Sequence, residues 1–164
     1  MTDVPAGDRN AILCHWLDAV PNDRLAHLIR DAGRSLGHRL TPLLAEHDIP
    51  FGHWAFLRVL WDRDGLTQKE LSDAIGVTEP TTFAAVKALI DKGYITRRHN
   101  TGNKRKFYVY LTPEGAALRD ILVPLAEKVN RVAVADIPPE NIALMRETLL
   151  KMIENLAAED ENGG

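Results

Sequence analysis

Residues 66–94 contain the pattern that decides the fold, and they read LTQKELSDAIGVTEPTTFAAVKALIDKGY. Thr67 and Glu70 have the spacing of a capping box, in which each side chain binds the other residue's backbone N–H at the start of a helix. Gly76 then allows the tight turn that a helix-turn-helix places between its two helices. The pattern therefore predicts a helix-turn-helix. Its first helix is expected to bury one stripe, which consists of Leu71, Ala74 and Ile75.

The second helix of the motif is expected to begin at Thr78, because threonine is a favourable N-cap residue. Pro80 fits the first turn, where its missing N–H has no helical partner. The inward-facing residues are expected to be Thr82, Ala85, Val86 and Leu89, and the outward-facing residues Thr81, Phe83, Ala84 and Lys87. Small and polar side chains at the exposed N-terminal end of a second helix suit entry into a major groove about 12 Å wide.

Two β-rich runs follow this helix and predict a hairpin. Residues 94–98 (YITRR) form its first strand and residues 106–111 (KFYVYL) its second, with the tip at residues 99–103. Asn and Gly in the tip are typical of a hairpin with a somewhat long loop. Basic side chains at the tip of such a ribbon are placed to reach phosphates or a minor groove.

The charge of the chain is unevenly distributed. The formal net charge is −3, but residues 87–106 contain seven bases and one acid, so this segment carries +6 and the remainder −9. A basic run is often only a solvated surface. Here the bases directly follow the helix-turn-helix pattern, and this position favours a contact with nucleic acid.

Apolar residues recur at helical spacing on both sides of the motif. They predict a long helix from Asp23 that ends before Pro50, since the residue before proline disfavours helical geometry. A largely apolar helix is expected over residues 52–63. Two more helices are expected, one from Pro113 and one from Pro138, because proline is well tolerated in a first turn.

Several classes of protein are disfavoured by the composition. No apolar run approaches the roughly 20 residues of a membrane helix, and the polar, acidic N-terminus differs from a signal peptide, so a cytoplasmic protein is expected. Cys14 is the only cysteine, so disulfide and cysteine-cluster zinc sites are excluded within the chain, and a packing role is favoured over a redox switch. No nucleophile elbow, phosphate-binding glycine loop or metalloprotease histidine pair occurs, so neither enzyme activity nor a cofactor is expected.

The order of these elements resembles the MarR family of bacterial transcriptional regulators over residues 24–157. The segments that carry the resemblance are LTQKEL (66–71), GVTEPTT (76–82), KGYI (92–95) with RR (97–98), and LTPEG (111–115). The resemblance implies a homodimer whose first, fifth and sixth helices interlock, with two winged lobes that read successive major grooves of double-stranded DNA. It also implies an effector site near the junction between the dimer helices and the DNA-binding lobes.

The expected fold is therefore mainly α with a small β wing, a winged helix-turn-helix flanked by N- and C-terminal dimerisation helices. The expected parts are an N-terminal arm (1–22), dimerisation helices (23–50 and 113–157), a winged helix-turn-helix DNA-binding domain (51–112) and a disordered tail (158–164). The expected DNA-binding residues are Thr67, Gln68, Thr78, Pro80, Thr81, Thr82, Lys87, Arg97, Arg98, Asn103, Lys104 and Arg105.

The wing departs from the family pattern at one position. Family wings often carry an aspartate before two basic residues, whereas Asn103 precedes Lys104 and Arg105 here. Asn103 has no charge for the ion pair that would orient the wing base, so a hydrogen bond would have to replace it.

A small-molecule effector is expected between the long first helix and the helix after it. The candidate effector residues are Arg30, Arg34, His38, His53, Trp54 and Trp61. Cationic donors on one helix and aromatic surface on its neighbour suit a small aromatic carboxylate or its thioester, because the ring needs apolar burial and the carboxylate needs charge-assisted hydrogen bonds. Two alternatives stay open: a solvated face for the first helix and ordinary core positions for the aromatic residues. A metal site is disfavoured, since adjacent arginines repel a cation.

The function predicted from the sequence is a sequence-specific regulator that binds a palindromic operator as a homodimer. Repression with release by an effector is the commoner mode in the family, and activation stays open. A winged-helix module that contacts only proteins is the main alternative, and an unrecognised small enzyme is the other. Loss of DNA affinity on replacing Lys104 and Arg105 by alanine would favour the regulator.

Overall fold

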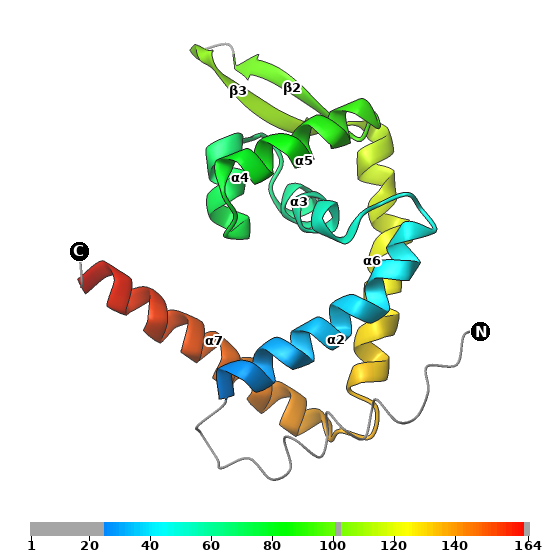
Figure 1. Cartoon of the computed structure of the whole chain (residues 1–164), viewed down its shortest axis with the longest axis vertical. Helices are drawn as coiled ribbons and strands as arrows, with labels where there is room; N and C mark the ends of the chain where they lie inside the picture. Colours follow the sequence, from blue (N-terminus) through cyan, green and yellow to red (C-terminus); the bar gives the residue numbers. More distant parts are fainter. Residues whose placement is uncertain (1–24, 101–102, 163–164) are drawn as a thin grey trace. The chain divides into compact units, whose positions relative to one another are not determined.

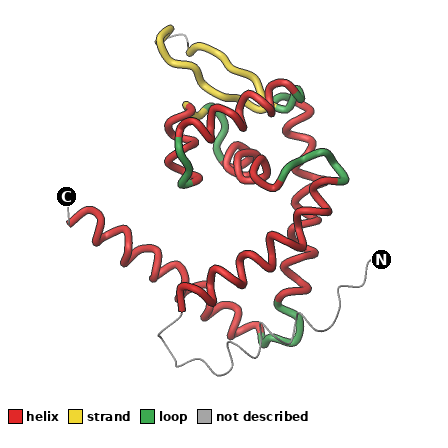
Figure 2. Tube along the Cα trace, in the orientation of Figure 1, coloured by secondary structure: helices red, strands yellow, loops and turns green. Residues whose placement is uncertain are grey.

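The computed structural model describes residues 25–100 and 103–162, which form helices and a small antiparallel sheet (Figures 1 and 2). The chain divides into two compact units, residues 1–126 and 127–164, with the boundary inside α6. The elements in chain order are α2 (Leu25–Ala45), α3 (Phe51–Asp62), β1 (Leu66–Thr67), α4 (Gln68–Ile75), α5 (Glu79–Asp91), β2 (Ile95–Asn100), β3 (Asn103–Leu111), α6 (Pro113–Ala133) and α7 (Pro139–Asn162). The predicted fold class, mainly α with a small β wing, is confirmed.

Helices α4 and α5 form the predicted helix-turn-helix. The capping box is present: Thr67 Oγ1 accepts from the Glu70 N–H at 3.2 Å, and Glu70 Oε2 accepts from the Thr67 N–H at 2.7 Å. Gly76 ends α4 with a φ of 75°, a left-handed conformation that glycine adopts without a steric penalty. Thr78 caps α5 by accepting from the Thr81 N–H, as its position in the sequence predicts.

The sheet has the strand order β1-β3-β2, so the predicted hairpin is completed by a short third strand. Ile95 lies opposite Leu111 in β2 and β3, and Leu66 of β1 lies opposite Val109 on the other edge of β3. The sequence did not predict β1, because two residues are too few to show an alternating pattern. The strand nevertheless ties the start of α4 to the wing.

The core of residues 51–112 lies between α3, α4, α5 and the sheet. Its fully buried side chains include Leu57, Leu60, Leu71, Val86, Leu89, Ile95 and Val109. One predicted core residue of α4 is wrong, since Ala74 is exposed and Ser72 is buried instead. Burial of Ser72 is tolerated because its Oγ lies 2.9 Å from the Gln68 carbonyl oxygen and 2.7 Å from Thr82 Oγ1, which satisfies the hydroxyl.

The C-terminal helix is longer than the sequence suggested. Helix α7 continues to Asn162, so the disordered tail predicted from residue 158 is wrong for residues 158–162. Residues 157–161 read AAEDE, alanine and glutamate favour helix, and the first helix breaker is Gly163. The predicted N-terminal arm, with Cys14, lies outside the described residues. Within residues 25–100 and 103–162, no helix combines the length and apolar character that a membrane crossing requires.

Candidate nucleic-acid interface

The N-terminal half of α5 presents the outward face that the sequence predicted. Pro80, Thr81, Ala84 and Lys87 are exposed, whereas the opposite face of the helix is buried against the core. The hydroxyls of Thr78 and Thr81 lie 2.9 Å apart, so these two side chains are held together at the tip of the helix. This end of α5 is exposed and polar at its tip, as suits a recognition helix that enters a major groove.

Thr82 does not belong to this outward face. Its side chain is fully buried, and its Oγ1 is paired with Ser72 Oγ in the core. The inclusion of Thr82 among residues that contact DNA is therefore wrong, because a DNA group cannot reach a hydroxyl enclosed between α4 and α5. Thr82 supports the recognition helix by fixing it to α4.

Thr67 and Gln68, the two residues at the start of α4 that were predicted to bind DNA, are in different environments. Thr67 belongs to the capping box of the helix. Thr67 Oγ1 also donates to Glu70 Oε2 at 2.7 Å, so its hydroxyl is engaged within the helix. Hydrogen bonds from the backbone and then the side chain of Thr67 lower the pKa of the Glu70 carboxyl. Gln68 differs, since its Nε2 is buried and has no hydrogen-bond partner.

Arg97 and Arg98 lie on opposite faces of the wing. Arg97 is opposite Val109, which is buried, so Arg97 shares the face that looks onto α5. Its guanidinium carbon lies 5.5 Å from the centroid of the Phe83 ring. Arg98 is on the outer face, with its guanidinium 5.6 Å from the Tyr110 ring. Asn103, Lys104 and Arg105 lie in β3, but their side chains are outside the described residues, so their contacts with DNA stay a prediction.

A network of hydrogen bonds joins the wing to its supporting helices. Asp64 Oδ1 accepts from the N–H of Gly65 at 3.0 Å and of Leu111 at 2.9 Å. At the same end of the sheet, Thr112 donates its N–H to the Tyr94 carbonyl at 3.0 Å and its hydroxyl to the Gly93 carbonyl at 2.6 Å. The end of α5, the base of the wing and the start of α6 are therefore fixed to one another.

Gly115 lies at the centre of this junction. Its N–H donates to Thr112 Oγ1 at 3.0 Å, and its carbonyl accepts from Trp61 Nε1 at 2.9 Å. A Cβ at this position would lie 1.9 Å from the Tyr94 carbonyl oxygen, a distance that no side chain can occupy. The LTPEG segment is thus a packing motif that allows the backbone of α6 to approach the end of the recognition helix.

The residues predicted to bind an effector are found in two different settings. Arg30, Arg34 and His38 are exposed on α2, and both arginines contact Asp31, at 3.4 Å and 2.6 Å. Trp54 is buried and packs edge to face on Trp61, with ring centroids 5.6 Å apart. The pairing of these arginines with Asp31 was not predicted from the sequence, although the spacing of Asp31 and Arg34 on one helix face is a signal for it.

Phe51 is an aromatic residue that the sequence analysis overlooked. Its exposed ring faces Gly37 of α2, where an added Cβ would lie 3.2 Å from the ring. Gly37 lies between Arg34 and His38 in the sequence. Among the described aromatic residues of α3, Phe51 is therefore the one whose ring lies against the stretch of α2 that contains Arg34 and His38. A glycine within a long helix was the available signal.

His53 lies near a contact between the α2–α3 loop and the end of α5. Lys92 Nζ donates to the carboxylate of Asp48 and, at 2.9 Å, to its carbonyl oxygen. Burial, and to a lesser extent the charge of Lys92, lowers the pKa of His53 below 6.5. The Nδ1 atom of His53 is buried and has no hydrogen-bond partner, so the neutral ring is favoured.

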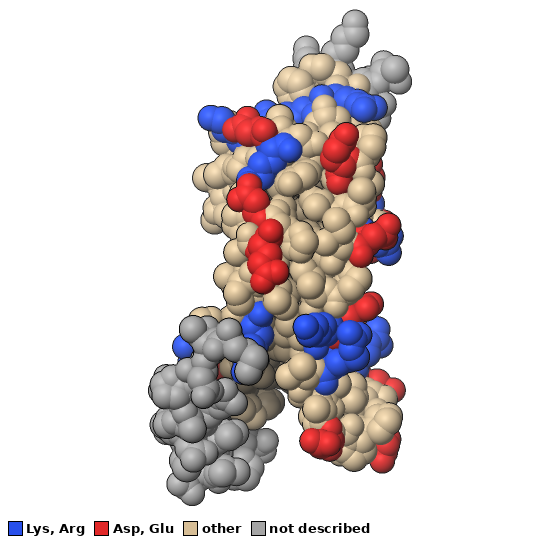
Figure 3. All heavy atoms as spheres, turned by 90° about the vertical axis from the view of Figure 1, so that its right-hand side faces the viewer, with Lys and Arg blue, Asp and Glu red and all other residues tan. Residues whose placement is uncertain are grey.

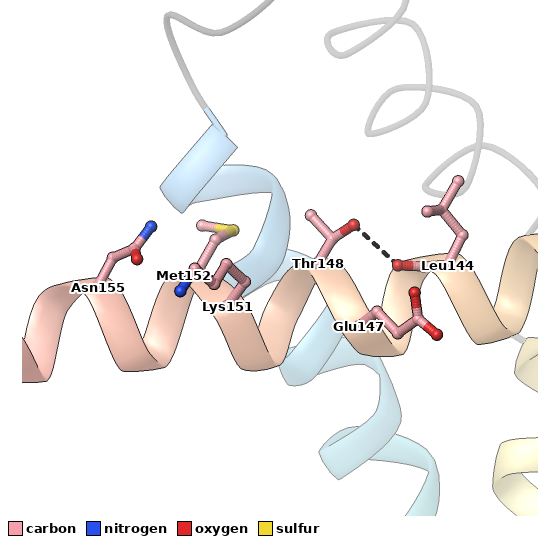
Figure 4. A pocket seen from close by; sticks show the side chains of 6 residues that line it. All are labelled: Leu144, Glu147, Thr148, Lys151, Met152 and Asn155. Atoms are coloured by element: carbon pink, nitrogen blue, oxygen red, sulfur yellow. Dashed lines mark hydrogen bonds between the residues drawn. The ribbon is translucent and has the colours of Figure 1, made fainter.

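Three further features of the described residues bear on possible binding sites: the surface charge, groups that could hold a metal, and surface hollows. Figure 3 shows Lys and Arg alternating with Asp and Glu on a mostly uncharged face. Within residues 25–100 and 103–162, no three His, Cys, Asp or Glu side chains are grouped to hold a metal ion. An open hollow of about 350 Å³ lies along α7 (Figure 4), and none of the six predicted effector residues lines it. Its lining residues are Leu144, Glu147, Thr148, Lys151, Met152 and Asn155.

The comparison with protein families agrees with this geometry. Residues 51–107, from the start of α3 to the returning strand of the wing, match the model of the MarR family. This segment of the chain is therefore similar to the MarR family domain. A relative described as an uncharacterised HTH-type transcriptional regulator of Staphylococcus aureus is 32% identical over 94 residues, which are 57% of this chain and 64% of the relative. The match thus spans less than two thirds of that relative.

Solved structures share the fold of the MarR domain and of its flanking helices. A MarR family transcriptional regulator from Listeria monocytogenes, solved with a 26mer DNA, has a TM-score of 0.76 and 24% identity, with 82% of this chain and 90% of that chain covered. Bordetella bronchiseptica BpsR has a TM-score of 0.71 and 22% identity, with 79% and 98% covered, in a structure concerned with regulation of its DNA binding by 6-hydroxynicotinic acid. The winged-helix fold is therefore that of known regulators.

Proposed function

We propose that this chain is a homodimeric transcriptional regulator that binds double-stranded DNA in a sequence-specific manner. The outward face of α5 is the observation that carries the proposal: its N-terminal half is exposed while its other face is fixed to α4 and the core. A surface helix held in this way, beside a β-hairpin, has the geometry of a winged-helix reader. The Listeria regulator solved with DNA supports the same role.

The homodimer is proposed from the apolar surface of the terminal helices. Leucine, isoleucine and valine side chains that a single chain leaves exposed occur in α2, α6 and α7. They are Leu25, Leu28 and Ile29 in α2, Ile121 and Val132 in α6, and Leu144, Leu150, Ile153 and Leu156 in α7. Apolar surface of this extent is typical of an interaction face, and a second copy of the chain covers it in a symmetric dimer.

Selection of bound duplexes from random DNA, followed by footprinting, tests the proposal. Because a two-fold dimer presents paired recognition helices, we expect an imperfect palindrome with half-sites about 34 Å apart. Protection of a single unsymmetrical half-site at saturating protein would contradict the dimer. Failure to recover any enriched duplex would favour a winged-helix module that contacts proteins.

Two sets of variants separate base reading from phosphate binding. Thr81→Ala and Lys87→Ala should weaken binding to the selected site. Lys104→Ala and Arg105→Ala should weaken binding to all duplexes and reduce the salt slope by about one unit for each lost phosphate contact. Lys128→Ala, an equal charge change on α6, is the matched control and should leave both quantities unchanged.

An anionic aromatic effector is proposed to release the protein from its operator. The cationic residues of α2 and the ring of Phe51, which packs against Gly37 of the same helix, support this proposal. Cationic side chains bind a carboxylate, and an aromatic side chain packs against a ring. The regulation of BpsR by 6-hydroxynicotinic acid, an aromatic acid, provides a precedent in the same fold. A ligand there would favour a dimer whose two lobes no longer fit successive grooves.

Calorimetry with matched aromatic acids, neutral aromatics and aliphatic acids tests the effector class. Arg34→Ala should abolish binding of the acids, and Phe51→Ala should weaken binding of the aromatic ones more than of the aliphatic ones. Equal binding of neutral and anionic rings, or an acid that binds Arg34→Ala as well as the unmodified chain, would remove the carboxylate assignment. The DNA-binding proposal is unaffected by that outcome.

A further inference from the structure

The recognition helix has few groups that can read bases through hydrogen bonds. From Glu79 to Ala84 its sequence is EPTTFA, without the arginine, lysine, asparagine or glutamine side chains that make bidentate contacts to purines. Thr82 is buried, and Thr81 is paired with Thr78 through their hydroxyls. Direct readout by this segment must therefore rely largely on apolar contact.

Phe83 is the side chain available for such a contact. The residue is 53% exposed, although it lies between a buried Thr82 and a buried Ala85. A helical side chain leans toward the N-terminus of its helix, so the ring covers the first turn of α5. That turn is the part of a recognition helix that meets base edges.

Arg97 fixes the position of the ring from the wing. Its guanidinium lies 5.5 Å from the ring centroid, within the range of a cation–π contact. Its Nε is buried and has no hydrogen-bond partner, so no hydrogen bond from this atom competes with the packing on Phe83. The exposed ring is therefore held between the recognition helix and the wing.

From this arrangement we infer that Phe83 reads the 5-methyl group of thymine in the major groove and that Arg97 is its positioning residue. The methyl group is the one apolar feature that distinguishes a base in that groove, and phenylalanine is among the side chains that contact it. This inference rests on the proposed DNA-binding function and deepens it, since it names the chemical feature of the operator that α5 recognises.

Replacement of thymine by deoxyuridine tests the inference, because it removes the methyl group and leaves every hydrogen-bonding group in place. The probe is the duplex selected by the full chain, with single thymines of each half-site replaced in turn. At one position per half-site, affinity should fall about fourfold for each methyl group lost, the effect of one buried methylene-sized group. Phe83→Ala should bind the thymine duplex more weakly and should bind the two duplexes equally.

Further variants distinguish a positioning role from a structural one. Arg97→Ala should lower the thymine-to-uracil affinity ratio, whereas Phe83→Leu, which keeps an apolar side chain, should preserve part of it. A ratio of one at every thymine in the unmodified chain, or a ratio that Phe83→Ala leaves intact, would overturn the inference. Binding of the selected duplex would continue in that case, so failure of the inference is distinguishable from failure of the DNA-binding proposal.

Discussion

The winged helix-turn-helix lobe and the terminal helix α7 handle their apolar side chains in opposite ways. In the lobe, large residues such as Leu57, Leu89 and Val109 are fully buried within one chain. In α7, Ile153 is 65% and Leu156 67% exposed, although α7 is as regular a helix as those of the lobe. The lobe completes its own core, whereas α7 presents an apolar surface of the kind that the proposed second copy of the chain would cover.

Polar groups show the same contrast. Side chains in the lobe bond across elements that are distant in sequence, as Asp64 does with Leu111 and Trp61 with Gly115. In α7 the described side-chain bonds run between neighbours on the same helix, as Lys151 does with Glu154. Long-range bonds fix tertiary structure, whereas local bonds only support a helix. The stability of the lobe should therefore be a property of the single chain.

The largest expected effect tests the self-contained packing of the lobe. Gly115→Ala places a Cβ 1.9 Å from the Tyr94 carbonyl oxygen, and two backbones must separate to relieve the overlap. We expect a loss of about 4 kcal/mol or more in the free energy of unfolding, the size typical of severe backbone or core damage. Urea unfolding followed by circular dichroism measures it.

Gly33→Ala is the matched control for this change. Gly33 is also helical, but a Cβ there meets no atom within 4 Å. Removal of a glycine from a helix interior should stabilise the chain by about 0.5–1 kcal/mol. If both variants unfolded alike, the close approach at Gly115 would have no energetic consequence, and the junction would not hold the lobe together.

The next effect concerns the incomplete surface of α7. Ile153→Asp combined with Leu156→Asp should weaken dimerisation at least about 100-fold, because each aspartate replaces apolar area and must be desolvated at the interface. Sedimentation velocity over a range of protein concentrations measures the change. Phe83→Asp introduces one such charge at a similarly exposed residue of the lobe and should leave the dimer intact. An unchanged dimer in the double variant would contradict the role proposed for α7.

The contrast between the two regions also explains what could be predicted from the sequence. The helix-turn-helix was predictable because its signals are local: the Thr67–Glu70 capping box, the left-handed Gly76 and the Thr78 N-cap are confirmed. The hairpin was predictable for the same reason, and strands β2 and β3 confirm it. Chemical features that act within a few residues leave a readable pattern.

Features that depend on distant contacts were harder to predict. Thr82 was assigned both to the core and to the DNA contacts, and only its bond to Ser72 decides in favour of the core. The placement of Phe51 against Gly37 and of Arg97 on Phe83 joins separate elements, so no local pattern reports either contact. The partners of the terminal helices stay a prediction, because the contacts that would define them lie between chains rather than within one.

A smaller effect tests the local part of the lobe's stability. Thr67→Ala removes the capping box of α4 and should cost about 1 kcal/mol in the free energy of unfolding. Thr67→Ser keeps the hydroxyl and should cost much less. Since hydrogen bonds from Thr67 lower the pKa of Glu70 below 4.5, the difference between Thr67→Ala and the unmodified chain should shrink as the pH falls below that value. A pH-independent difference would mean that the carboxylate adds nothing to the cap.

The smallest expected effect is the loss of stability at low pH that His53 causes. Its dependence on protein concentration tests whether the lobe is stable independently of the dimer. Burial, and then the charge of Lys92, lowers the pKa of His53 below 6.5. Below about pH 6.5 the unfolded chain therefore binds more protons at this residue than the folded chain, and stability falls with the pH, whereas above it both states are neutral and the effect vanishes. Relative to His53→Asn, the unmodified chain should lose less than about 1 kcal/mol of its free energy of unfolding between pH 7.5 and pH 5.5.

Because His53 lies in the self-contained lobe, this loss, measured by urea unfolding, should be the same at low and high protein concentration. A loss that grows on dilution would link His53 to the dimer contact and contradict the independence of the lobe, and a gain in stability at low pH would contradict the direction of the pKa shift.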